Sequence, residues 1–97
     1  MTVTSWDSKD FAKSIKPICE NKAVKDIQII MPAQSDIKEH KAPFDITVQV
    51  LRGLVDFCVE DKSFELKEFD MISLKADIAH SLFAKEDSIL RLSLAKI

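Results

Sequence analysis

The sequence has little glycine and few cysteines, and it lacks the features that mark a membrane segment or an exported chain. Its 97 residues include one glycine, Gly53, and two cysteines, Cys19 and Cys58, which form no CxxC or other metal-ligand spacing. No apolar run approaches the roughly 20 residues of a membrane-spanning helix. The first residues lack the basic region and apolar core of a signal peptide. We therefore expect reduced thiols, no membrane span and a cytoplasmic location.

Concentrated positive charge and catalytic motifs are also missing. The 14 Lys and Arg residues are scattered among 16 Asp and Glu residues, which gives a net charge of −2. Without a basic patch, RNA-recognition aromatics or a zinc-finger spacing, we expect no nucleic-acid partner. No Ser/His/Asp or Cys/His set, phosphate loop or EF-hand spacing is present. The sequence therefore predicts no catalytic residue.

The chain does contain short β-rich runs separated by turns, within a length that suits one domain. The predicted strands cover residues 27–31, 46–51, 55–59, 62–66, 71–74 and 88–94. Gly53 and polar stretches mark the turns, and residues 33–39 read as a polar connection. This spacing predicts an all-β, antiparallel sandwich or barrel. One helix over residues 80–94 is the alternative, although the period-two alternation of residues 89–94 and the break at Asp87-Ser88 oppose it.

The first 26 residues are less regular. Trp6, Phe11 and Ile15 fall at helical spacing, but Pro17 would end such a helix after barely two turns. Residues 14–19 also read as an edge strand, where a proline is tolerated. We predict that residues 1–26 form an arm with strand character, outside the core and at a dimer interface, and that residues 27–97 form the barrel.

The only two histidines, His40 and His80, stand at the two ends of the β-rich middle of the chain. Side chains 40 residues apart meet only if the sheet closes on itself, as a barrel does. Two imidazoles facing one cavity supply half of a usual metal site, since zinc or iron normally takes at least one further protein ligand.

These residues resemble the cupin superfamily of small β-barrels. The first cupin motif reads G-x5-H-x-H-x(3,4)-E-x6-G; His40 falls on its first histidine and Gly53 on its closing glycine. Residues 69–80 have the length and apolar pattern of the second motif, G-x5-P-x-G-x2-H-x3-N, with His80 on the histidine. The resemblance covers about residues 27–97 and is strongest to stand-alone cupins of a single domain. It implies an antiparallel jelly-roll β-barrel.

The chain departs from both motifs at the ligand positions. The second histidine of the first motif is Ala42, and its glutamate falls at Ile46 or Thr47. In the second motif, Phe69, Lys75 and Asp77 stand where the family has glycine, proline and glycine. The resemblance therefore implies a degenerate metal site that has lost two of four ligands. We predict no cofactor; the alternative is a divalent transition metal held weakly by His40, His80 and water.

His40, His80, Phe57 and Gln49 are the candidate pocket residues, although alternation from Ile46 places Gln49 on the opposite face of its strand. Both histidines also have a purely structural interpretation, as does Phe57 as a core residue. Apolar residues on both faces of residues 46–51 predict a homodimer.

Three hypotheses follow for the function. The first is a homodimeric module with a degenerate metal site, whose barrel cavity binds a small molecule or a glycan. The second is a metal-dependent oxygenase or isomerase that uses His40 and His80. The third is a structural or regulatory dimer with a filled barrel.

Overall fold

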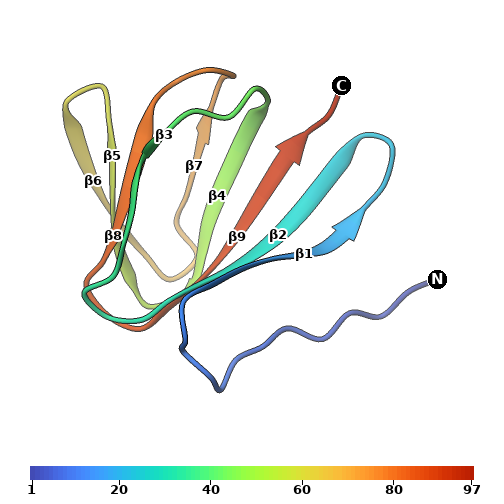
Figure 1. Ribbon diagram of the computed structural model, residues 1–97, viewed down its shortest axis with the longest axis horizontal. Helices are drawn as coiled ribbons and strands as arrows, with labels where there is room; N and C mark the ends of the chain where they lie inside the picture. The colour runs from blue at the N-terminus through green and yellow to red at the C-terminus, as the bar shows by residue number, and fades with distance from the viewer.

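The computed structural model describes residues 1–97 and contains nine strands and no helix (Figure 1). No helix is therefore present that could cross a membrane. The prediction of an all-β fold is confirmed. The strands are β1 (Ser14–Glu20), β2 (Val24–Met31), β3 (Asp36–His40), β4 (Asp45–Arg52), β5 (Leu54–Val59), β6 (Lys62–Lys67), β7 (Met71–Leu74), β8 (His80–Ala84) and β9 (Ser88–Ala95).

The strands form two antiparallel sheets whose inner faces share one core. The five-stranded sheet has the order β1-β2-β9-β4-β7, and the four-stranded sheet has the order β3-β8-β5-β6. Alternation along each strand decides which side chains enter the core. In β4, Ile46, Val48 and Val50 are buried, whereas Thr47 and Gln49 between them are half-buried on the outer face.

The alternation of buried and half-buried side chains along β4 contradicts one expectation from the sequence. The apolar residues of β4 were expected on both of its faces, as a surface for a second copy. Instead, Ile46, Val48 and Val50 all belong to the core of their own chain, and the outer face between them carries a hydroxyl and an amide. The homodimer remains a prediction, but it has to rest on other surfaces.

The strands predicted from the sequence are confirmed, and two further strands were missed. β3 lies largely in the stretch expected to be a polar connection, because only Ile37 of its five side chains turns inward. β8 and β9 occupy the region for which one helix was the alternative, and that alternative is wrong. The two missed strands pair with each other and carry the two histidines.

The N-terminal segment lies along the outside of the five-stranded sheet. β1 pairs with β2, with a register shift between Pro17 and Cys19, so part of the predicted arm is the edge of this sheet. Before β1 the chain runs back below β1 and β2 (Figure 1). Gln28 on β2, only 1% exposed, fixes it there: its side chain accepts from Asp7 N (3.2 Å) and donates to Asp7 O (2.6 Å). The predicted boundary at residue 27 thus falls inside β2, and a place at a dimer interface stays a prediction.

Candidate functional site

The two histidines lie side by side in the four-stranded sheet. His40 is the last residue of β3 and His80 the first of β8, and the two are partners in the antiparallel register. Their ring centroids are 4.3 Å apart, with the planes tilted by 59°. The imidazoles therefore do meet as expected, but as neighbours across the β3–β8 pair within one sheet and not through closure of the sheet.

Two loops meet at the rim next to these rings. One joins β3 to β4 and the other joins β7 to β8; they lie side by side at the top of Figure 1. Asp77 N donates to Ala42 O (2.8 Å), and Ala76 N donates to the Asp45 carboxylate (2.9 Å). These bonds tie the two loops together, so the end of each histidine strand has a fixed position.

Backbone contacts set the tautomer of each histidine. His40 Nδ1 lies 2.9 Å from Lys38 O, and His80 Nδ1 lies 2.9 Å from Ile78 O. Because a carbonyl oxygen only accepts, each Nδ1 carries the proton, and each neutral ring keeps a lone pair on Nε2. No buried side-chain nitrogen lacks a partner, so the unbonded Nε2 of His80 still reaches solvent.

Phe57 completes the cluster from the core side. Its ring stacks on that of His80, with centroids 5.4 Å apart and planes within 8°. His80 is only 3% exposed, whereas His40 is exposed. Burial lowers the pKa of His80; the bond to Ile78 opposes this change and the nearby His40 adds to it. His80 is thus a neutral acceptor near pH 7, pressed against an apolar wall.

The fourth candidate, Gln49, does not belong to this cluster. It lies on the outer face of β4, and its Nε2 donates to Phe69 O at 3.2 Å. Grouping Gln49 with the histidines was therefore wrong in geometry, although the alternation of β4 had indicated the opposite face.

No hollow opens onto the histidines. The four cavities on the molecule, of about 280–340 Å³, are lined by residues other than His40, His80 and Phe57. Thirteen buried side chains fill the space between the sheets, and Ala42 and Ile78 pack against them near the rim. The histidines therefore form a patch on the rim of a packed sandwich rather than the floor of a cavity.

Comparison with solved structures identifies the architecture, whereas no family model and no curated protein matches the sequence. An RmlC-like cupin protein from Desulfovibrio desulfuricans aligns with a TM-score of 0.86 at 14% identity, over 99% of this chain and 96% of its own. An RmlC-like cupin family protein from Methanocaldococcus jannaschii, described as a double-stranded β-helix, aligns with a TM-score of 0.82 at 14% identity, over 98% and 90%. This chain has the cupin fold.

A protein of unknown function from Streptococcus pyogenes is also similar, with a TM-score of 0.80 at 20% identity, over 92% of this chain and 78% of that one. Sequence identities this low show a shared architecture but not a shared activity. The function of this cupin-fold chain therefore has to be argued from its own side chains.

A resident cupin metal does not fit the side chains at this rim. Where the cupin motif has its other ligands, this chain has Ala42, which packs against the core, and either Ile46, which is 4% exposed within the core, or Thr47, which lies on the outer face of β4. No group of three or more His, Cys, Asp or Glu side chains is arranged to hold a metal ion. Two imidazoles are thus the whole protein donor set, below the three or four ligands of a stable site.

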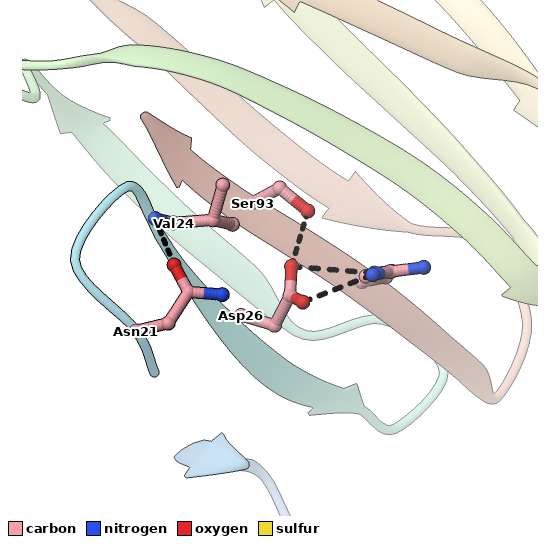
Figure 2. Close-up of polar contacts among 5 residues, drawn as sticks. Asn21, Val24, Asp26 and Ser93 are labelled. Atoms are coloured by element: carbon pink, nitrogen blue, oxygen red, sulfur yellow. Dashed lines mark hydrogen bonds and ion pairs between the residues drawn. The ribbon is translucent and has the colours of Figure 1, made fainter. Parts of the chain in front are cut away.

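Sequence reasoning missed a polar cluster on the outer face of the five-stranded sheet. Figure 2 shows Asp26 of β2 receiving a bond from Ser93 of β9. The side chain of Arg91, also on β9, donates to the same carboxylate. The signal was present in residues 88–94, where Arg91 and Ser93 alternate with leucines. The partner on β2 becomes visible only when the strand register is known.

Proposed function

We propose that the protein is a non-catalytic, homodimeric module that binds a small molecule or a glycan through its surface. The donor set at the rim is the observation that carries this proposal: His40 and His80 stand together, while Ala42 and either Ile46 or Thr47 fall where the motif has its other ligands. The packed interior places this binding at the surface, because an interior ligand would have to displace core side chains.

The alternative of a metal-dependent oxygenase or isomerase has less support from the residues. Such an enzyme would complete the coordination of its metal with water or substrate alone, beyond the two imidazoles. A site of this kind binds metal with lower affinity than one with three or four protein ligands.

Metal content tests the proposal directly. The full chain would be purified without added metal and analysed for iron, manganese, zinc and nickel, beside the variants His40→Ala and His80→Ala. We expect far less than one metal ion per chain in all three proteins. One ion per wild-type chain that is lost in both variants would favour the enzyme and overturn the proposal.

The homodimer in this proposal is supported by the edge of the five-stranded sheet. β1 pairs on one side only, and Ile15 on it is exposed. A strand with a free edge and an exposed apolar side chain is a ready surface for a second copy. Light scattering at micromolar concentration should give the mass of a dimer for the wild type and of a monomer for Ile15→Lys. A wild-type monomer would contradict this part.

A structural or regulatory dimer is the second candidate function, and the packed interior favours it specifically. A thermal-shift screen of sugars and small metabolites separates it from a binding module, because only a module that binds gains stability with ligand. We keep the cytoplasm as the proposed location, which the free thiols of Cys19 and Cys58 support.

A further inference from the structure

The outer face of the five-stranded sheet is hollowed where β9, β4 and β7 lie side by side. Two cavities, of about 340 and 290 Å³, open there and share Thr47 and Ser93 in their linings. Six of the residues that line these cavities form two cross-strand rows in the sheet register: Ser93, Thr47 and Ser73, then Arg91, Gln49 and Met71. We call these six residues the outer groove. Rows two residues apart point to one face of a sheet, so the six side chains form one surface.

The first row offers hydroxyl groups. Thr47 Oγ1 and Ser73 Oγ lie 3.1 Å apart, and Ser93 Oγ donates to the Asp26 carboxylate (2.5 Å). Each hydroxyl both donates and accepts, so the row can pair with ligand hydroxyls in either sense. The ion pair of Lys75 and Asp45, whose charged atoms are 3.7 Å apart, lines the same cavity as this row.

The second row carries two planar polar groups in fixed positions. Arg91 donates to both oxygens of Asp26, from Nε (3.3 Å) and from Nη2 (2.9 Å). The Asp26 side chain is only 14% exposed, and the bonds from Arg91 hold the pKa of its carboxyl below the usual range. The guanidinium is therefore oriented and its charge is balanced, while N–H groups remain for a ligand. Such a pair suits a neutral polar ligand better than an ion.

An exposed aromatic side chain lies on the turn that borders this row. Gln49 Nε2 donates to Phe69 O (3.2 Å), so the groove is bonded to the turn between β6 and β7. Phe69 has a positive φ of 73° and is 70% exposed, and Met71, next but one, is also exposed. A bulky residue in the left-handed region is an outlier that persists only where the surroundings impose it. Here the turn is held by Phe69 N donating to Val50 O at 2.7 Å.

We propose that the outer groove binds a neutral oligosaccharide. Sugar hydroxyls match the row of Ser and Thr hydroxyls and the fixed Gln49 and Arg91 groups, while the C–H face of a ring packs on Phe69 and Met71. The larger of the two cavities, of about 340 Å³, falls at the lower end of the size range of ligand sites. The inference rests on the proposed function as a binding module, but it uses the face of the sheet that points away from the histidines.

A glycan array probed with the labelled full chain tests the inference. The array would carry neutral hexasaccharides of glucose, xylose and N-acetylglucosamine, together with acidic chains for comparison. We expect retention of at least one neutral hexasaccharide, and calorimetry then gives its affinity. An array without retained sugars overturns the inference. The proposed function survives that result if the thermal-shift screen finds another ligand.

Variants separate the groove from the rest of the surface. Phe69→Gly removes the ring and suits the positive φ, so it should fold at least as stably as the wild type while binding at least about tenfold more weakly. Thr47→Val, which keeps the shape of a β-branched side chain, should also weaken binding. Phe64→Ala is the matched control, because Phe64 is an exposed aromatic residue on β6 of the other sheet. This variant should bind as the wild type does.

Two results with these variants would contradict the inference. Wild-type affinity in both Phe69→Gly and Thr47→Val would place sugar binding elsewhere. A dimer that dissociates in Phe69→Gly would identify this face as the contact between two copies rather than as a sugar site.

Discussion

Replacing Gly53 by alanine tests the turn that joins the two sheets. Gly53 lies between β4 and β5 with φ of 99°, a conformation that side-chain-bearing residues rarely adopt. A Cβ added there would lie 2.2 Å from Ser88 Oγ and 2.5 Å from Asp87 O. The second contact is with backbone, which no rotamer change relieves.

The expected cost has three sources. The positive φ costs alanine about 1–2 kcal/mol, and overpacking a filled site costs about 1–3 kcal/mol. Ser88 is fully buried, and its Oγ accepts from Leu54 N (3.2 Å) and donates to Glu86 O (2.8 Å). Moving it aside would leave the half-buried N–H of Leu54 unpaired, at up to about 1–3 kcal/mol. We therefore expect Gly53→Ala to lower the free energy of unfolding by at least about 3 kcal/mol.

Urea unfolding followed by far-UV circular dichroism measures this loss, and a thermal scan should show a midpoint lower by about 12 °C or more. The double variant Gly53→Ala/Ser88→Gly is the control. It removes the Oγ contact but keeps the positive φ and the approach to Asp87 O, so it should recover less than half of the loss. A single variant within about 0.5 kcal/mol of the wild type would refute this description of the turn.

Three further changes have expected outcomes. Asp26→Asn should lower the free energy of unfolding by about 1–2 kcal/mol near neutral pH, measured by urea titration, because it weakens the bonds with Arg91. Since the folded pKa of Asp26 is lowered, this difference between the two proteins should shrink as the pH falls below 3.8 through the folded pKa. A difference that stays constant with pH would contradict the ion pair as the cause. His80 has a folded pKa below its ordinary 6.5, so the unfolded chain binds this proton first as the pH falls. The free energy of unfolding should therefore drop more between about pH 7.5 and about pH 5 in the wild type than in His80→Gln, and equal slopes would argue against burial of the ring. Gln28→Leu should release the segment around Asp7, with faster amide exchange before β1 and unchanged exchange in β9; unaltered exchange throughout would contradict the tether.

The outline of the fold could be predicted from alternation because most strands bury every second side chain. β4 and β5 show this most clearly. β3 was not predicted because it lies at the edge of its sheet and four of its five side chains are exposed, which leaves no apolar alternation in the sequence. β8 was not predicted because it is only five residues long, which leaves too short an alternation to detect.

The candidate site was predictable in part. The meeting of His40 and His80 was expected from a closed sheet, whereas it results from the direct pairing of β3 with β8. The loss of two ligands was predicted from the motif that the chain resembles, where Ala42 and either Ile46 or Thr47 stand at ligand positions. The outer groove could not be predicted, because it combines residues from three strands whose register the sequence does not state. The fold-back of the N-terminal segment onto Gln28 is equally a product of tertiary packing.

The affinity of the histidine pair for a metal ion tests the central claim most directly. Calorimetric titration of the metal-free full chain with zinc chloride near neutral pH compares the wild type with His40→Ala/His80→Ala. With two imidazoles as the only protein ligands, we predict binding weaker than about 10 μM, against the nanomolar or tighter binding of closed zinc sites. Stoichiometric binding at nanomolar affinity that the double variant abolishes would contradict the claim that this rim holds no resident metal.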